Sequence, residues 1–535
     1  MLKVVYPLVA VFSHSPSATF MTPLSATGSP KTVSPQRGIG VSHSMLDTLQ
    51  PGLTRLLARD ALPILGPDGT EPPTRQQGSR RRRFSRRRNF THQPASPPGD
   101  REMERRRFLR GASSVVGASL LSGSWSAAQS AGGPSVPPMG MTNLGGGAPT
   151  DEAFWTQIRQ QFRLSYDRIY LNTAGLGPSP RRVIRAVSEM IEDLEDRCES
   201  GHNHDLWETA KGRAARILGC DPDEIAYTRN TTEGVNIVCN GLPLETGDEV
   251  ITTTHEHVGN TISWLARQRR DGIRMRVFEP SMASAAETLQ RLTDLITPRT
   301  RAISISHITT ATGQVLPLEQ IGKLAAEHDL YYFVDGAQSA GHIPLDMRAI
   351  GCHAYATSGH KWLLGPKGTG LLYVRKDALD LVEARWVGAY SGGGDFDMST
   401  GEFSFATTAQ RYEFGTVPVS LFHGLSEAMG FLLDLGMHRV WDRSHYLGTR
   451  LIEGLDSAGA EVISPRAADE HSGIVTFRVE GMSRADLQGY LAKDFKIRSR
   501  GIYEGGLDAV RVAPHIYSAA TDVDRVIEAV EALKL

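Results

Sequence analysis

Two residues of opposite charge follow apolar runs in the middle of this 535-residue chain. Asp335 ends the run Tyr-Tyr-Phe-Val-Asp, and Lys361 stands further along in a Ser-Gly-His-Lys cluster before a glycine-rich bend. Burying either charge without a partner is costly. A buried lysine can form a Schiff base with a carbonyl group, and a carboxylate can pair with a protonated ring nitrogen. The pair therefore predicts one pyridinium cofactor held at both ends, pyridoxal phosphate (PLP). The alternative is an ordinary surface lysine.

Apolar runs and amphipathic stretches alternate around this pair. The runs typical of strands are EIAYT, EVITTT, RMRVFE, AISISHI, YYFVD, AYATS and GLLYVR. Amphipathic stretches such as LEQIGKLAAEHDL lie between several of them. This alternation predicts an α/β domain with a mainly parallel sheet that is covered on both faces. After about residue 417 the pattern changes to helices with a few strands, such as GIVTFRV and AVRVAP, which predicts a smaller α+β C-terminal domain.

Polar residues follow several of these predicted strands. His257 comes after EVITTT, the cluster with Lys361 follows AYAT, and Thr231 and Thr232 follow EIAYT in the turn RNTTEG. Ligands of parallel sheets bind beyond the carboxyl ends of the strands, so we expect these loops to meet at one edge. Asn230 is the expected N-cap of a helix whose first hydroxyls could hold a phosphate. Threonines at helix starts more often only cap the helix.

The composition limits the classes of function. The net charge is −1, with 40% hydrophobic and 22% charged residues, as in a soluble enzyme and with no overall field for nucleic acid or membrane. A basic run at residues 79–90 is either a nucleic-acid arm or, as we favour, a disordered or untranslated segment. Four cysteines without CxxC or Cys/His spacing predict neither a disulfide scaffold nor a metal site. GPKGTG lacks the residue order of a P-loop.

The N-terminal region predicts export rather than a fold. Residues 1–102 are rich in Ser, Pro and Arg without a sustained period, which predicts disorder or a stretch upstream of the true start. Residues 103–131, MERRRFLRGASSVVGASLLSGSWSAAQSA, look like a twin-arginine signal, so Met103 is the expected initiator. The apolar run 111–121 is too short to span a bilayer. We expect a periplasmic protein exported by the twin-arginine machinery, with a Gly/Pro linker at 132–150 before globular residues 151–535.

A family resemblance extends this interpretation. The run VDGAQSAGHIPLDM and the run GCHAYATSGHKWLLGPKGTGLLYV resemble the class V aminotransferases of fold type I, a PLP family that includes cysteine desulfurases and isopenicillin N epimerase-like proteins. IYLNTAGLGPSP, TRNTTEGVN, THEHVGN, SHITTATGQVLP, RYEFGT and AVRVAPHIY follow in family order across roughly residues 165–520. The resemblance implies a large PLP-binding domain at about 176–416 with a seven-stranded sheet. It implies a small domain made from about 151–175 and 417–535.

The resemblance also implies roles for the residues that match. Lys361 is expected to form the Schiff base and move protons, Asp335 to pair with the pyridine nitrogen, and His257 to stack on the ring. Gln338 is expected to donate to the ring hydroxyl. From the residues alone, His257 could be only a polar strand-end residue and Gln338 only a helix-start hydrogen bonder.

Further roles concern the phosphate, the substrate and a second subunit. The resemblance implies that Thr231, Thr232, Ser358 and His360 bind the phosphate. Thr416 would reach the phosphate of a neighbouring subunit, which implies a homodimer with shared active sites. Arg511 would clamp the substrate α-carboxylate, as guanidinium geometry allows, and Asn172 would also bind substrate. Arg511 could instead form a surface ion pair.

Two departures from the family pattern narrow the activity. Thr310 stands where many members have an asparagine near the ring hydroxyl, and KIRSRGIYEGGLDAV lacks the nucleophilic cysteine that cysteine desulfurases carry there. We therefore expect an exported class V aminotransferase that acts at the α-carbon of an amino acid or amine-bearing metabolite. An isopenicillin N epimerase-like epimerase and a C–S β-lyase are alternatives. An inert exported binding protein on a PLP fold is an alternative of another class, and intact Lys361 and Asp335 speak against it.

Overall fold

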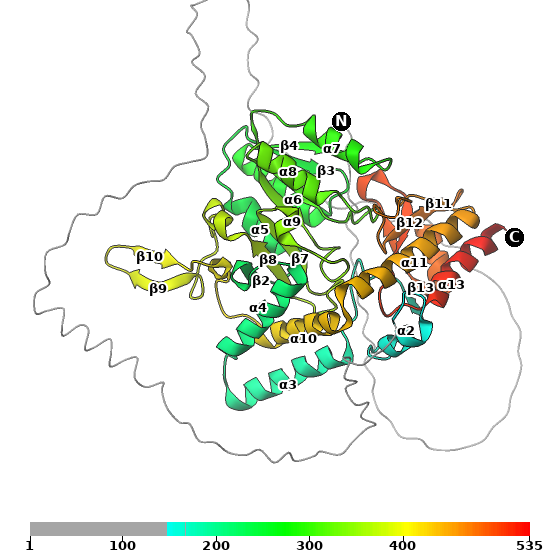
Figure 1. Ribbon diagram of the computed structural model, residues 1–535, viewed down its shortest axis with the longest axis horizontal. Coiled ribbons are helices and arrows are strands. Elements are labelled where there is room, and N and C mark those ends of the chain that lie inside the picture. Colours follow the sequence, from blue (N-terminus) through cyan, green and yellow to red (C-terminus); the bar gives the residue numbers. More distant parts are fainter. Residues whose placement is uncertain (1–146, 166, 535) are drawn as a thin grey trace, which may run out of the picture. The chain divides into compact units, whose positions relative to one another are not determined.

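The structure, a computed structural model, describes residues 147–165 and 167–534 (Figure 1). Seven strands form the central sheet of this part of the chain. In spatial order they are β2 (Ile225–Thr228), β8 (Gly370–Val374), β7 (Ala354–Ser358), β6 (Tyr331–Asp335), β5 (Thr300–Ser306), β3 (Glu249–Thr253) and β4 (Arg274–Phe278). Strand β8 runs antiparallel to both neighbours, and the other adjacent pairs are parallel. The predicted mainly parallel, seven-stranded sheet is confirmed.

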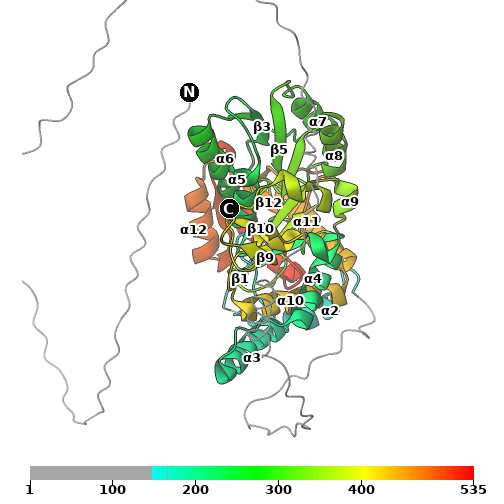
Figure 2. The same ribbon diagram turned by 90° about the vertical axis from the view of Figure 1, so that its left-hand side faces the viewer.

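Helices cover both faces of this sheet. The helices of the described residues are α2 (Glu152–Arg159), α3 (Arg181–Arg197), α4 (His204–Leu218), α5 (Thr231–Gly241), α6 (Val258–Asp271), α7 (Ala285–Thr293), α8 (Leu318–Glu327), α9 (Met347–Ile350), α10 (Val419–Leu435), α11 (Met437–Ser457), α12 (Arg484–Lys493) and α13 (Ala520–Glu531). Short 3₁₀ turns are η2 (Pro222–Glu224), η3 (Lys376–Leu381), η4 (Ala409–Tyr412), η5 (Glu504–Gly506) and η6 (Ala532–Lys534). Figure 2 shows α6 and α8 on opposite sides of β5.

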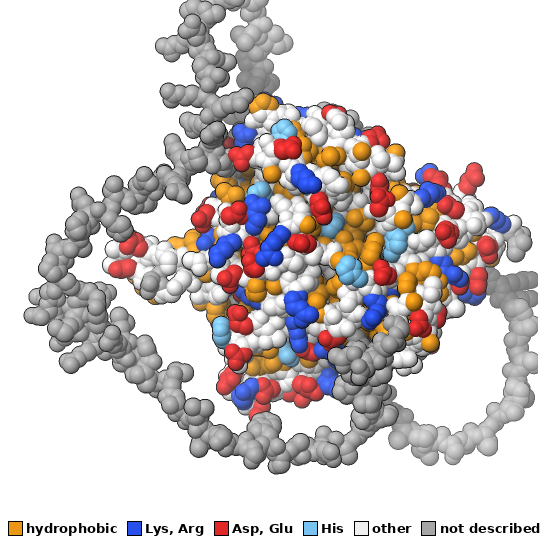
Figure 3. All heavy atoms as spheres, viewed as in Figure 1, with side chains coloured by type: hydrophobic (Ala, Val, Ile, Leu, Met, Phe, Trp, Pro, Cys, Tyr) orange, Lys and Arg blue, Asp and Glu red, His pale blue; other side chains and the backbone are white. Residues whose placement is uncertain are grey.

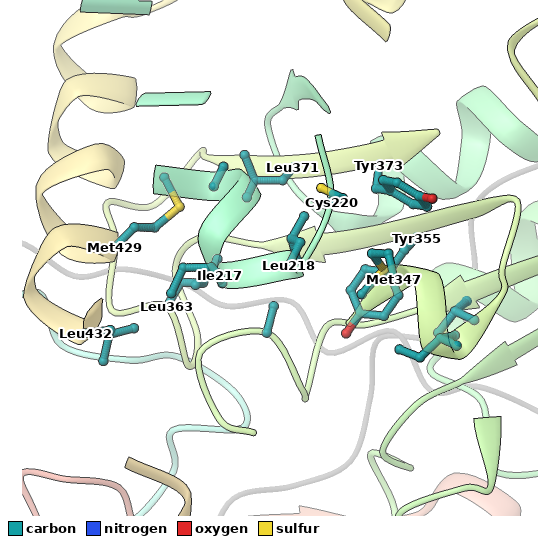
Figure 4. Packing of buried hydrophobic residues seen from close by; sticks show 14 of the residues in the cluster. Ile217, Leu218, Cys220, Met347, Tyr355, Leu363, Leu371, Tyr373, Met429 and Leu432 are labelled. Carbon is teal, nitrogen blue, oxygen red and sulfur yellow. The ribbon is translucent and has the colours of Figure 1, made fainter. Parts of the chain in front are cut away.

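The alternation of side chains along the strands divides the core into two layers. Tyr332 and Val334 of β6 pack with α4, α8 and α10, whereas Tyr331 and Phe333 pack with α5 and α6. Figure 4 shows part of the first layer, where Leu218 of α4 lies near β7 and β8. Because both faces are covered, β6 and β7 are buried at every position, which explains their continuous apolar sequences.

A second sheet lies in the C-terminal part. Its antiparallel strands, in spatial order, are β11 (Glu461–Val462), β12 (Val475–Arg478), β15 (Ala509–Val512) and β14 (Arg500–Ile502). Apolar side chains of α11, α12 and α13 pack with this sheet, so the predicted α+β character is confirmed. Strand β1 (Ile169–Tyr170) pairs in parallel with β13 (Ile497–Arg498), which places residues 169–170 beside the C-terminal part. The exact domain limits stay predictions.

A hairpin of β9 (Gly392–Asp397) and β10 (Glu402–Phe405) extends away from the central sheet (Figure 1). Figure 3 shows basic and acidic side chains interspersed over the face in view. Within residues 147–165 and 167–534, no helix has the length and apolar character that crossing a membrane requires. The predicted signal at 103–131 and the predicted disorder at 1–102 lie outside the described residues.

Candidate active site

A cavity of about 330 Å³ lies where the carboxyl ends of β2, β3, β5, β6 and β7 meet. Its lining residues are Ala174, Gly175, Asn230, Thr231, Thr232, His257, Thr310, Asp335, Ala337, Ser358, His360, Lys361, Arg500 and Arg511. The loops after parallel strands converge at one edge of a sheet, which explains why residues so far apart in sequence come together. The cavity contains most of the residues that the sequence singles out. Gln338, Asn172 and Thr416 are not among its lining residues.

Asp335 and Lys361 both contribute charged groups to this cavity. Asp335 is 5% exposed, and its Oδ1 accepts a hydrogen bond from the N–H of Ala337 at 2.9 Å. Its Oδ2 and the Lys361 ammonium have no hydrogen-bond partner among the described residues. An aldehyde-bearing ring with a protonated nitrogen fits these two groups, because it would offer the amine a carbonyl carbon and the carboxylate a donor.

Burial shifts the ionisation of both groups toward the neutral form. Burial lowers the pKa of Lys361 to about 8, and Arg511 and Arg500 act in the same direction, while Asp335 opposes the shift. Burial also raises the pKa of Asp335, although the Ala337 N–H and Lys361 hold it down. Lys361 therefore supplies a neutral amine in a pH range where an exposed lysine stays protonated.

A close backbone approach fixes the loop that carries Lys361. The N–H of Gly177 donates to the carbonyl oxygen of His360 at 2.7 Å. A Cβ atom at Gly177 would collide with the carbonyl oxygen of Lys361. This contact explains in physical terms why the IYLNTAGLGPSP stretch has a glycine at that position.

Hydroxyl groups and a helix start form one end of the cavity lining. Thr231 begins α5, and its N–H donates to Ser358 Oγ at 3.0 Å, while the two hydroxyl oxygens lie 2.7 Å apart. Asn230 caps the helix by accepting from the N–H of Glu233 at 3.0 Å. Burial lowers the pKa of His360 to about 4, and its Nδ1 is buried without a partner. Because a helix N-terminus and hydroxyls attract anions, this end fits a phosphate group.

His257 lines the cavity as a neutral imidazole. It is the N-cap of α6, and its Nδ1 accepts from the N–H of Gly259 at 3.1 Å. Burial lowers its pKa to about 4, and Lys361 lowers it further. Nδ1 is the acceptor, so the single ring proton is on Nε2. This neutral ring suits the predicted stacking role and leaves His257 without a free basic nitrogen.

A buried carboxylate that the sequence analysis missed holds the segment that carries His257. Glu256 is 4% exposed and accepts four hydrogen bonds, from the Thr253 hydroxyl at 2.8 Å, the Asn260 amide at 2.9 Å, and the Ser306 N–H and hydroxyl at 3.0 and 2.6 Å. Burial nevertheless raises its pKa. No local pattern marks this glutamate, because its donors come from separate elements.

Gln338 holds the cavity wall instead of facing the cavity. Its Oε1 accepts from the indole N–H of Trp362 at 2.7 Å, which fixes the orientation of the amide because an indole nitrogen only donates. Its Nε2 donates to the Ala174 carbonyl at 3.0 Å and to Thr310 Oγ1 at 3.1 Å. Both N–H groups are therefore used within the protein. The predicted donation from Gln338 to the ring hydroxyl stays a prediction, and it would require one of these two N–H groups to change its partner.

The hydroxyl of Thr310 offers a hydrogen-bond donor at the cavity. Its Oγ1 also accepts from Nη1 of Arg511 at 3.0 Å, so both lone pairs of the hydroxyl have partners. A hydroxyl with two filled acceptor sites can only donate to a third group. Thr310 lines the cavity, so its proton is available to an oxygen of a bound molecule.

Two arginines line the cavity near Thr310. Arg511 is 1% exposed, and its Nη1 donates to the Thr310 carbonyl at 2.7 Å. Its Nη2 donates to Asn172 Oδ1 at 3.4 Å, which makes Asn172 a support for Arg511. Burial lowers the pKa of Arg511 to about 9, and Arg500 adds to this shift. Sequence reasoning missed Arg500, because its position depends on the pairing of β14 with β15.

No cysteine lines this cavity. The chain's four cysteines are free, with Cys220, Cys239 and Cys352 buried and Cys198 exposed. Burial raises the pKa of Cys239 and Cys352 to about 12, so neither is a reactive thiolate at neutral pH. In residues 147–165 and 167–534 no group of three or more His, Cys, Asp or Glu side chains is placed to hold a metal ion.

Comparisons with known proteins agree with this geometry. Residues 169–526 match the family "Aminotransferase class-V". A probable cysteine desulfurase of Methanothermobacter thermautotrophicus is 29% identical over 395 residues, 70% of this chain and 96% of that protein. The isopenicillin N epimerase of Amycolatopsis lactamdurans is 30% identical over 393 residues, 71% of this chain and 98% of that protein.

Solved structures share the fold. The cysteine desulfurase CsdA of Escherichia coli has a TM-score of 0.63 at 26% identity, covering 71% of this chain and 98% of that one. The cystine C–S lyase C-DES, in complex with cysteine persulfide, has a TM-score of 0.63 at 27% identity, covering 68% and 98%. Another C-DES structure, 28% identical, has glycine covalently linked to PLP. The chain belongs to the class V aminotransferase family of fold-type-I, PLP-dependent enzymes.

Proposed function

We propose that this protein removes the α-proton of an α-amino acid and works as an exported aminotransferase. One observation carries the proposal. The half-buried amine of Lys361, with its pKa lowered to about 8, lines the same cavity as the Asp335 carboxylate and the Arg511 guanidinium. PLP, when bound, supplies the electron sink that stabilises negative charge on the α-carbon.

The residues of the cavity would have different roles. Asp335 would hold the ring nitrogen, and the start of α5 with Ser358 would hold the phosphate. Arg511 would orient the amino acid through its α-carboxylate, because a buried guanidinium binds a carboxylate with charge-assisted hydrogen bonds. Lys361 then removes the α-proton as general base, which typically contributes 10²–10⁴-fold to a rate.

The protonation states of the cavity favour transamination over epimerisation. Among its titratable lining residues, His257 has its ring proton on Nε2 and His360 lies at the phosphate end. Lys361 is thus the base available to take up the α-proton and return it. Epimerisation by two bases requires a second group that delivers a proton to the opposite face of the α-carbon, and neutral His257 is a poor acid for that step.

A C–S β-lyase is the second candidate. The likeness to the cystine C–S lyase C-DES favours it, and β-elimination begins with the same removal of the α-proton. A desulfurase that forms a persulfide on its own cysteine is disfavoured, because the cavity contains no thiol.

A homodimer with shared active sites and export by residues 103–131 are part of the proposal. Large exposed apolar side chains support an interface around the β9–β10 hairpin: Trp386, Val387, Phe396, Met398 and Phe403. Exposed apolar side chains of this size, when they gather, mark interaction sites in soluble proteins. Thr416 would cross that interface to the phosphate of the neighbouring subunit.

Incubating the purified, PLP-loaded protein with a panel of amino acids tests the function. Conversion of the cofactor spectrum to that of pyridoxamine phosphate marks an aminotransferase. Release of pyruvate and sulfide from cysteine conjugates marks the lyase, and deuterium uptake at the α-carbon without conversion marks an epimerase. A protein that binds PLP but gives none of these signals with any amino acid would contradict the proposal and fit the inert binding protein.

A further inference from the structure

Arg500 and Arg511 are paired residues on neighbouring antiparallel strands. In the register of β14 and β15, Arg500 is the partner of Arg511. Paired residues project from the same face of a sheet, with Cβ atoms roughly 5 Å apart. Both arginines also line the same cavity, so its wall contains two guanidinium groups.

Like charges in directly opposed positions destabilise a sheet. The lowered pKa of Arg511 reflects this, since Arg500 adds to the effect of burial. The protein offsets the repulsion only in part. Glu504 is 3% exposed in its side chain and accepts from Nη2 of Arg500 at 2.5 Å.

Several guanidinium N–H groups remain without partners among the described residues. Arg500 has its Nε and Nη1 unpaired, and its side chain is 26% exposed. The Nε of Arg511 is also unpaired, although it is buried. A buried donor without an acceptor is costly, so the Nε of Arg511 indicates where a ligand accepts a hydrogen bond, and the unpaired donors of Arg500 are open to the same ligand.

Further cationic groups lie near Arg511. Tyr170 lies close enough to Arg168, Arg498 and Arg511 for all three to lower its pKa against the raising effect of burial. Among the described residues, Glu504 is the acidic side chain that forms an ion pair with Arg500. The surroundings therefore favour an anionic ligand over a neutral one.

We propose that the substrate carries a second carboxylate in its side chain, which Arg500 binds while Arg511 binds the α-carboxylate. This proposal rests on the proposed function, because it assumes that an α-amino acid enters the cavity. The substrate class is then the acidic amino acids and the corresponding dicarboxylic 2-oxo acids. Glu504 holds Arg500 in place when the side-chain carboxylate is absent and competes with that carboxylate when it is present.

Ligand binding without turnover is the first test. Titrating the PLP-loaded protein with succinate or propionate, followed by the absorbance of the cofactor, gives a Kd for a diacid and for a monoacid. We expect succinate to bind about tenfold or more tightly, as one added hydrogen-bonded charge pair implies. Equal Kd values for the two acids would overturn the proposal.

Variants of the two side chains give a second, independent test. Arg500→Met should weaken succinate binding about tenfold or more and leave propionate within about twofold. Glu504→Gln keeps Arg500 and removes the competing carboxylate, so it should tighten succinate binding severalfold. Because Glu504→Gln retains Arg500, its result tests the proposal even if Arg500→Met does not fold. No gain for succinate in Glu504→Gln, or equal losses for both acids in Arg500→Met, would refute the role of Arg500.

Turnover separates this proposal from the proposed function. Aspartate and glutamate should have higher kcat/KM than asparagine and glutamine, and Arg500→Met should abolish that difference. If amino acids with neutral side chains are converted and acidic ones are not preferred, only the substrate class is wrong. If no amino acid is converted while succinate still binds more tightly than propionate, the proposed function fails and the dicarboxylate site stands.

Discussion

Asp335 ends β6 and Lys361 follows the neighbouring parallel strand β7; the two residues line one cavity but form no ion pair with each other. Each group influences the pKa of the other. An ammonium and a carboxylate in direct contact would neutralise each other's charge. Because the two groups do not contact each other, both are available to a bound ligand, which is PLP in this family.

The lowered pKa of Lys361 predicts how PLP attachment depends on pH. Attachment requires the neutral amine, which predominates above the pKa. The rate of PLP attachment to apoprotein should therefore rise with pH through a midpoint near 8 and level off above it. An exposed lysine would place this midpoint above 10. Stopped-flow absorbance across pH 6.5–10 measures the midpoint.

Neighbouring charges should move this midpoint in opposite directions. Asp335 raises the pKa of Lys361, so Asp335→Asn should lower the midpoint, while Arg511→Met should raise it. Lys367→Ala changes an exposed lysine near the same loop and should leave the midpoint within a few tenths of a pH unit. Shifts of the same sign in both site variants would contradict the assignment of the titrating group to Lys361.

The hydroxyl of Thr310 predicts a difference between two conservative substitutions. Thr310→Val removes the acceptor of the Gln338 amide and of Arg511, and so leaves two buried donors unpaired. We expect it to lower the free energy of unfolding by about 1–3 kcal/mol and to weaken PLP binding, whereas Thr310→Ser should retain most of both. Chemical denaturation and equilibrium dialysis measure the two quantities. PLP binding that is unchanged in Thr310→Val would show that the hydroxyl gives nothing to the cofactor.

The sequence was sufficient to place residues whose position depends on local context. Asp335 and Lys361 stand at the ends of apolar strands, and Thr231 follows its own strand at a capped helix start, so their meeting at one cavity could be predicted from nearby residues. Gln338 differs, because its amide is consumed by Trp362 and Ala174, which only the folded chain brings close. A match to a family motif could not reveal that competition.

Arg500 illustrates a second limit of sequence reasoning. Its importance comes from the antiparallel register of β14 with β15, which sets it opposite Arg511. Short strands in a C-terminal α+β part have no pattern that fixes register in advance. Likewise, the four hydrogen bonds to Glu256 come from three segments, and no spacing in the sequence announces them.

Shared active sites predict complementation between two inactive variants. Lys361→Ala removes the base, and Thr416→Arg places a bulky charge where the phosphate of the neighbouring subunit would bind. Each homodimer should be inactive. In a hybrid dimer, one of the two sites combines Lys361 from one chain with Thr416 from the other and is intact. Random pairing of equal amounts makes about half of the dimers hybrids, so the refolded mixture should recover about a quarter of wild-type activity. Recovery of none, with hybrid dimers present by mass spectrometry, would contradict sharing.

Buried histidines predict a loss of stability in mild acid. His515 is fully buried, and burial lowers its pKa to about 4, below the 6.5 of an unfolded chain. Its contribution is fully present above pH 6.5 and is lost as the pH falls toward 4, about 2 kcal/mol at pH 5. The ring of His342 packs beside that of His515, and burial lowers the pKa of His342 as well.

Urea unfolding at pH 7.5 and pH 5 measures this loss. His515→Gln should make the stability less dependent on pH over that interval. The same substitution at the exposed His204 should leave the dependence unchanged. An equal effect of both substitutions would contradict a role for burial.

The most direct measurement locates the attachment of PLP. The holoprotein is reduced with borohydride, digested, and its pyridoxylated peptides are sequenced by mass spectrometry. The account predicts one modified residue, Lys361, in the peptide that contains Ser-Gly-His-Lys, and no stoichiometric modification in Lys361→Ala. Stoichiometric modification of another lysine, or none at any lysine of a protein that holds PLP, would contradict it.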